Sequence, residues 1–166
     1  KTHTTEFASS DPAPTRNPFN TAHTPGGSSS GSGAAVAAGM CLAALGTQTG
    51  GAVLRPAAYN GLGGFKPETG RISKYGVVPL SWTLDHVGII ARTVEDAALV
   101  FQALAGYDHR DLHTLAAAVP DCSSLERPQP PRLGLVKQYF FERADEEMRR
   151  HTEEVVEVLR RAGASV

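Results

Sequence analysis

The sequence predicts an α/β fold. Short apolar runs bounded by glycine alternate along the chain with stretches whose apolar residues recur at helical spacing. The composition agrees, because 41% hydrophobic and 20% charged residues are ordinary values for a globular protein. With 166 residues the chain has the length of one domain. We therefore expect residues 1–166 to form a single, partial domain.

The first half of the chain predicts small, closely packed elements. Residues 1–25 contain four prolines and predict a connecting segment with one short helical turn near residues 5–8. The glycine-rich segment 24–65 has one full charge, Arg55, and too many Val, Leu and Ala residues for a disordered linker. In this segment we expect a helix over 32–40, a strand over 43–47, a short helix within 52–59 and a strand over 62–65.

The second half carries clearer start and stop signals. Residues 66–84 predict a loop, because proline and glycine interrupt every periodic pattern there. A strand over 85–91 precedes a helix that Thr93 caps and Gly106 ends. The buried stripe of this helix is expected to contain Val94, Ala97, Ala98, Phe101, Leu104 and Ala105.

The last part of the chain predicts two strands around one long helix. We expect an exposed crossing over 107–131, a strand over 132–136, and an amphipathic helix from Asp145 to Ala162. A further strand should begin at Ser165, so the chain is expected to stop within the fold. The apolar face of the helix is expected to contain Met148, Val155, Leu159 and Ala162.

Charge and cysteine content exclude several classes of function. The formal net charge of −1 gives no attraction to nucleic acid or to an anionic membrane, and no run is apolar enough for a membrane helix. Two cysteines favour a reducing cytoplasm over a secreted disulfide framework. His109 and His113 flank Asp111 in a polar loop without further ligands, so we expect neither a metal site nor a cofactor.

Two segments, 26–33 and 46–56, place glycines next to hydroxyl-bearing residues. Glycine permits positive φ angles and leaves backbone N–H groups exposed. A row of such N–H groups at a turn or helix start can hold an oxyanion, and a neighbouring hydroxyl can act as nucleophile or proton relay.

The order of motifs resembles the amidase signature family. The chain has GGSS at 26–29 and GTQTGGAVLRP at 46–56. After these come Lys66-Pro67, Gly70-Arg71 with Ser73, Leu84-Asp85 with Gly88, and Ala91-Arg92-Thr93-Val94 with Asp96-Ala97. The resemblance covers most of residues 1–108 and, more loosely, 132–166. It implies the amidase signature fold, an α/β fold with a mixed sheet flanked by helices. It also implies amide hydrolysis by a Ser–cisSer–Lys triad.

The resemblance assigns roles residue by residue. Ser28 matches the bridging cis-serine, and Ser29 matches a second serine that supports the site through hydrogen bonds. Position 52 belongs to the nucleophilic serine but carries Ala52, which has no hydroxyl. The backbone N–H groups of Thr49, Gly50, Gly51 and Ala52 would form the oxyanion hole.

The third member of the triad is not found in the chain. Lys1 matches a non-catalytic lysine, and the catalytic lysine of the family precedes it. We therefore expect a fragment truncated at both ends and inactive as written. An engineered Ser→Ala change and a natural alanine both fit the sequence.

Gln48 stands where many members carry Asp. By resemblance, some amidases with Gln there use the arginine at position 55 to hold a substrate carboxylate, for which its forked guanidinium is suited. The alternative is that Arg55 pairs with a structural acid.

Three functions follow from these residues. The first is an amidase that releases ammonia or an amine from a small amide. The second is a non-catalytic binding domain. The third is the amidase subunit of a tRNA-dependent amidotransferase, which more often carries Asp at position 48. The expected partner is a small-molecule amide, with no direct nucleic-acid or membrane contact, and the protein could form a homodimer.

Overall fold

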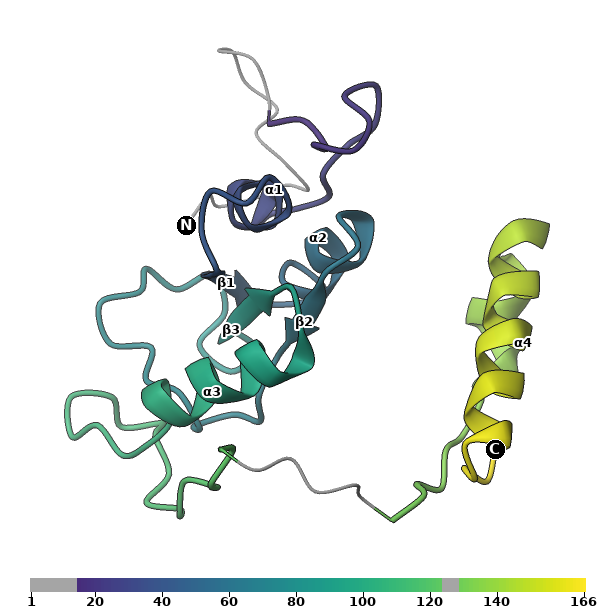
Figure 1. The fold of residues 1–166 in the computed structure, drawn as a ribbon. Helices are drawn as coiled ribbons and strands as arrows, with labels where there is room; N and C mark the ends of the chain where they lie inside the picture. The colour runs from purple at the N-terminus through teal and green to yellow at the C-terminus, as the bar shows by residue number, and fades with distance from the viewer. Residues whose placement is uncertain (1–14, 124–128) are drawn as a thin grey trace. The chain divides into compact units, whose positions relative to one another are not determined.

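The computed structural model describes residues 15–123 and 129–166 (Figure 1). These residues fall into two compact units, 15–123 and 129–166, which are described separately. The helical turn expected near residues 5–8 lies outside the described residues. A single domain over 1–166 stays a prediction.

The first unit is built on a three-stranded sheet. Its strands are β1 (Ala43–Gln48), β2 (Gly63–Phe65) and β3 (His86–Ala91), and β3 lies in the middle with an antiparallel partner on each side. The α/β fold with a helix-flanked sheet is confirmed, and both strand pairings of this sheet are antiparallel. Each predicted strand of this unit is present within two residues of its expected bounds.

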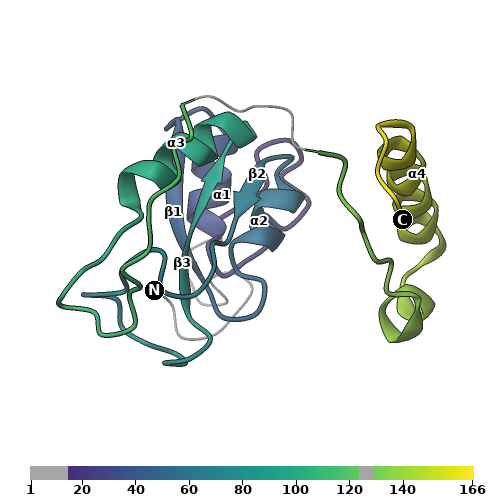
Figure 2. The same ribbon diagram turned by 90° about the horizontal axis from the view of Figure 1, so that it is seen from below.

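Helices cover both faces of this sheet (Figures 1 and 2). Side chains of β3 alternate between the faces, as the two-residue period of a strand requires. Val87, Ile89 and Ala91 pack with Ala97 and Phe101 of α3 (Val94–Leu104). Ile90 points to the opposite cluster, with Val36 of α1 (Ser30–Ala37), Val53, and Ala57 of α2 (Leu54–Tyr59).

The helix-start signals are confirmed. The Thr93 hydroxyl accepts a hydrogen bond from the N–H of Asp96 at 3.0 Å, which makes Thr93 the N-cap of α3. In the second unit, the Asp145 carboxylate accepts from the N–H of Met148 at 2.8 Å and caps α4 (Glu146–Arg161). Gly163, with φ +98°, follows the end of α4 as expected.

The predicted buried stripe of α3 is only partly correct. Ala97 and Phe101 are buried, but Val94 is 70% exposed and Leu104 is 38% exposed. Val94 is the first residue of α3 and lies before its first core contact, at Ala97, whereas Ala105, just past the end of α3, packs against the core. Helical spacing identifies a face, but the length of that face that is buried depends on the partner.

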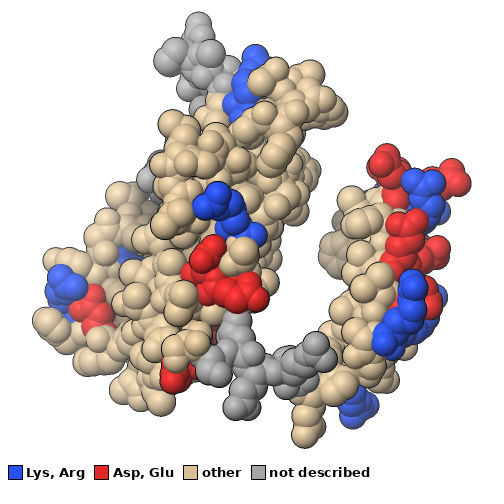
Figure 3. All heavy atoms as spheres, viewed as in Figure 1, with Lys and Arg blue, Asp and Glu red and all other residues tan. Residues whose placement is uncertain are grey.

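The second unit contains α4 and an irregular π-type turn, η1 (Lys137–Phe141). The predicted strand over 132–136 is wrong, because only Arg132 pairs, in a single parallel bridge with Ser165. The expected apolar face of α4 is also wrong in part, since Met148 and Val155 are exposed and Val156 is buried. Charged side chains crowd the visible face of α4, whereas few appear on the visible face of the first unit (Figure 3).

Among the described residues, no helix combines the length and the hydropathy needed to cross a bilayer.

The central strand gives a direct test of the core. Ile89 is fully buried in β3, so Ile89→Ala should lower the free energy of unfolding by about 2–5 kcal/mol. Val94→Ala is the control, because the exposed Val94 side chain predicts a change below about 0.5 kcal/mol. Urea unfolding monitored by circular dichroism measures both. Equal losses would contradict the burial of Ile89 at the centre of the sheet.

Candidate active site

The start of α1 lies against the outer edge of β1. Ser29 is the residue before α1, and its hydroxyl bonds the N–H and the C=O of Thr47 at 3.3 and 3.5 Å. One turn later, the Ser32 hydroxyl donates to the C=O of Leu45 at 2.7 Å. An edge strand presents unpaired backbone groups, and here serine hydroxyls satisfy them.

Gly46 permits this close approach. A Cβ atom on Gly46 would lie 2.6 Å from Ser29 Oγ and 2.9 Å from Ser29 Cβ. A side chain at position 46 would therefore displace the segment that contains Ser28 and Ser29.

The turn after β1 is held by Gln48. This side chain is 3% exposed, and its Oε1 accepts from the N–H groups of Val53 and Leu54 at 2.9 and 3.0 Å. Its Nε2 donates to the C=O of Gly50 at 3.3 Å. The Gln48 carboxamide is thus occupied within its own turn and fixes the start of α2.

One backbone hydrogen bond joins the serine segment to this turn. The N–H of Ser29 donates to the C=O of Ala52 at 3.1 Å, and the neighbouring Gly27–Ser28 peptide bond is cis. The amide N–H groups of Gly50, Gly51 and Ala52 make no hydrogen bond within the part of the chain that the structure describes. The turn therefore presents three N–H groups beside the serine segment.

A cleft of about 550 Å³ opens beside the serine segment. Ser28, Ser29 and Thr47 line it together with Ser73 and Tyr75. Ala52, Gln48 and Arg55 are not among its lining residues. Arg55 lies close to the turn, because a Cβ on Gly51 would be 3.7 Å from its Nε. The structure thus gathers the two serines in one cleft and places the glycine turn next to it.

Asp85 belongs to the Leu84-Asp85 motif, to which the sequence alone assigned no role at the site. It lies immediately before β3, is 3% exposed, and accepts hydrogen bonds from the Thr49 hydroxyl and from the N–H groups of Leu80 and Ser81. An acidic residue that opens an apolar strand was the available signal. His86 points elsewhere, to Thr69, as expected for adjacent strand residues.

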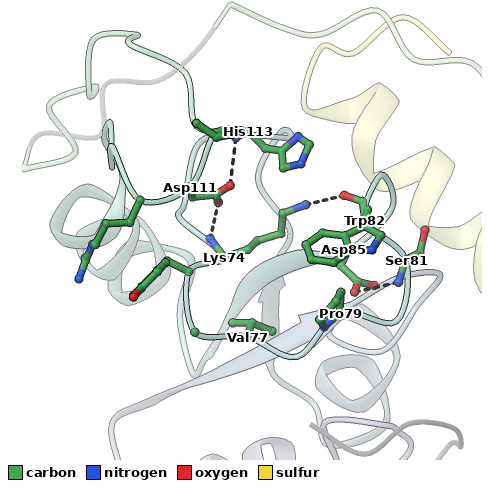
Figure 4. Close-up of a pocket in the computed structure, with 12 residues that line it drawn as sticks. Lys74, Val77, Pro79, Ser81, Trp82, Asp85, Asp111 and His113 are labelled. Atoms are coloured by element: carbon green, nitrogen blue, oxygen red, sulfur yellow. Dashed lines mark hydrogen bonds between the residues drawn. The ribbon is translucent and has the colours of Figure 1, made fainter.

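Asp85 also lines a second cavity, of about 330 Å³ (Figure 4). Opposite it, Asp111 accepts from the N–H groups of Lys74 and His113 at 2.7 and 3.0 Å. Burial alone would raise the pKa of Asp111, but these hydrogen bonds, together with the charges of Lys74 and His113, lower the pKa below its usual value. Nearby, the side-chain hydrogen bond from Arg110 holds the pKa of Asp108 well below its usual range.

No group of three or more His, Cys, Asp or Glu side chains within residues 15–123 and 129–166 is placed to hold a metal ion.

Comparison with known proteins identifies the family. Residues 3–166 match the family model described as Amidase. The chain belongs to the amidase family. This membership agrees with the fold, the serine segment and the glycine turn.

Relatives of this amidase-family chain share sequence over most of it. It is 42% identical to a glutamyl-tRNA(Gln) amidotransferase subunit of Gloeobacter violaceus, over 100% of this chain and 36% of the relative. The corresponding protein of Synechococcus sp. is 49% identical over 84% of this chain and 30% of the relative. The chain therefore spans about a third of the length of these curated relatives.

Solved structures of amidase-family proteins have the same fold as this chain. The crystal structure of the corresponding glutamyl-tRNA(Gln) amidotransferase subunit from Thermotoga maritima superposes with a TM-score of 0.81 at 38% identity, over 91% of this chain and 34% of that one. The native peptide amidase from Stenotrophomonas maltophilia superposes with a TM-score of 0.76 at 38% identity, over 91% of this chain and 32% of that one. The amidase signature fold is confirmed.

The Ser29–Gly46 contact predicts the effect of one methyl group. Gly46→Ala should lower the free energy of unfolding by about 1–3 kcal/mol, because the added Cβ overlaps Ser29. Gly31→Ala is the matched control. A Cβ on Gly31 meets no atom within 4 Å, and alanine in α1 should stabilise the protein by about 0.5–1 kcal/mol. Urea unfolding measures the free energy of unfolding of both variants. An increase for Gly46→Ala would contradict the close contact between Gly46 and Ser29.

Proposed function

We propose that this chain carries the serine segment and oxyanion turn of an amide-hydrolase site. The observation that supports this most directly is the hydrogen bond from Ser29 N–H to the C=O of Ala52. It ties the serine segment to a turn whose N–H groups at Gly50, Gly51 and Ala52 have no acceptor in the described residues. Family membership gives this arrangement its chemistry.

In the proposed reaction, a serine hydroxyl at position 52 attacks the amide carbonyl carbon. Its proton passes through Ser28 to a lysine, and the carbonyl oxygen becomes an oxyanion held by the N–H groups of the turn. Collapse of the tetrahedral intermediate breaks the C–N bond, and Ser28 returns a proton to the departing amine. Water then releases the acyl group as a carboxylic acid. With Ala52 the attacking oxygen is absent, so the proposed state of this chain is binding without turnover.

A second candidate is the amidase subunit of a larger enzyme. The relatives at 42% and 49% identity are each named as one subunit of glutamyl-tRNA(Gln) amidotransferase, and this naming favours a heteromeric assembly over the homodimer. Hydrolysis of glutamine in preference to other small amides would support this assignment, whereas preference for other amides would favour a free-standing amidase. The proposed compartment is the cytoplasm, in keeping with the free thiols of Cys41 and Cys122.

Restoring a serine tests the proposed reaction. In the complete protein, Ala52→Ser should raise ammonia or amine release from a panel of small amides by a factor on the order of 10⁴ or more, because it supplies the nucleophile. Coupled spectrophotometric detection of ammonia and direct detection of amine measure the change.

Ser28→Ala in the Ala52→Ser protein is the control and should remove the gain. If Ala52→Ser shows no turnover on any amide, the hydrolase proposal fails and the binding-domain alternative stands.

The position of Arg55 predicts substrate selectivity. If its guanidinium holds a substrate carboxylate, Arg55→Met in the Ala52→Ser protein should raise KM for amides with a free carboxylate about tenfold to a hundredfold. KM for neutral amides of the same length should not change. Steady-state kinetics on such matched pairs decides, and equal effects on both would assign Arg55 to a structural role.

A further inference from the structure

Asp85 joins two separate segments through its two carboxylate oxygens. One oxygen, Oδ2, accepts the N–H groups of Leu80 and Ser81 at 2.6 and 3.0 Å. The other, Oδ1, accepts the hydroxyl of Thr49. A buried carboxyl group is costly unless it is hydrogen-bonded, and these three donors bond the buried carboxylate of Asp85. Figure 4 shows the side chain directed toward the 79–82 loop, which supplies two of the donors.

Thr49 is the first residue of the turn that presents the unpaired N–H groups. The base of this turn is fixed by Gln48, through Val53 and Leu54. Its far end is fixed by the bond from Ser29 to Ala52. The Thr49 hydroxyl supplies a third fixed point, and that point depends on Asp85.

We infer that Asp85 is a positioning residue, which holds the amide N–H groups of Gly50, Gly51 and Ala52 in place through the Thr49 hydroxyl. This inference rests on the proposed function, because those N–H groups matter only if they bind an oxyanion. Oxyanion stabilisation depends on donors being held where charge develops, and a displacement of about 1 Å can lower a rate about 10²-fold.

The two oxygens of Asp85 allow positioning to be separated from general support. Thr49→Val keeps the shape of the side chain and removes the hydroxyl that bonds Oδ1, whereas the bonds from Leu80 and Ser81 to Oδ2 remain. Thr49→Ser keeps the hydroxyl. Thr69→Val is a matched control, because it removes a threonine hydroxyl whose bond, at 2.8 Å, goes to the ring of His86, the residue after Asp85, and not to Asp85 itself.

Kinetics of the complete protein in the Ala52→Ser form gives the first test. Thr49→Val should lower kcat about 10²-fold with little change in KM, since the lost positioning acts on the transition state. Thr49→Ser should restore kcat to within about threefold of the parent form, and Thr69→Val should leave it unchanged. Equal kcat for the Val and Ser variants at position 49 would overturn the inference.

A second readout keeps the test independent of turnover. In the protein with Ala52, Thr49→Val should shift the ¹H–¹⁵N resonances of Gly50, Gly51 and Ala52, whereas Thr49→Ser and Thr69→Val should not. If Ala52→Ser shows no turnover, the proposed function fails while these resonances still decide whether Asp85 positions the turn. Unmoved resonances in the Val variant would overturn the inference and leave Asp85 as a support of the 79–82 loop alone.

Discussion

The site depends on a close approach between Ser29 and the backbone of β1 at Gly46. Because position 46 has no side chain, the Ser29 hydroxyl can bond both the N–H and the C=O of Thr47. The backbone N–H of Ser29 in turn donates to the C=O of Ala52. The same contact satisfies an exposed strand edge and aligns the serine segment with the turn. Stability of the edge and geometry of the site therefore have one physical origin.

A second glycine, Gly88 of β3, provides space for Val53 beside Gly46. Gly46 pairs with Gly88 across the sheet, and a Cβ on either residue would lie 3.0 Å from a methyl group of Val53. Val53 is fully buried on this glycine pair and ends the turn that starts at Thr49. The turn is thus anchored by apolar packing at Val53 and by hydrogen bonds at Gln48 and Thr49.

The sequence predicted what local signals encode. The caps at Thr93 and Asp145, the order of elements and the glycine–hydroxyl segments all follow from residues close together in the chain. The exposure of Val94 and the missing strand over 132–136 could not be predicted in this way, because each depends on how much partner surface lies opposite. The role inferred for Asp85 could not be predicted from the Leu84-Asp85 motif, because its bond to Thr49 joins residues 36 positions apart.

The backbone contacts that hold position 52 do not depend on which side chain it carries. The contacts that hold this position use its backbone, because the C=O of Ala52 binds Ser29 and the C=O of Gly51 binds the N–H of Arg55. None of these bonds involves a side chain at position 52. A serine hydroxyl there would be an addition to a turn already fixed by Gln48, Thr49 and Ser29. In the proposed site, the backbone therefore governs binding of the carbonyl oxygen, and a side-chain hydroxyl at position 52 supplies the nucleophile that cleavage requires in addition to Ser28 and the lysine.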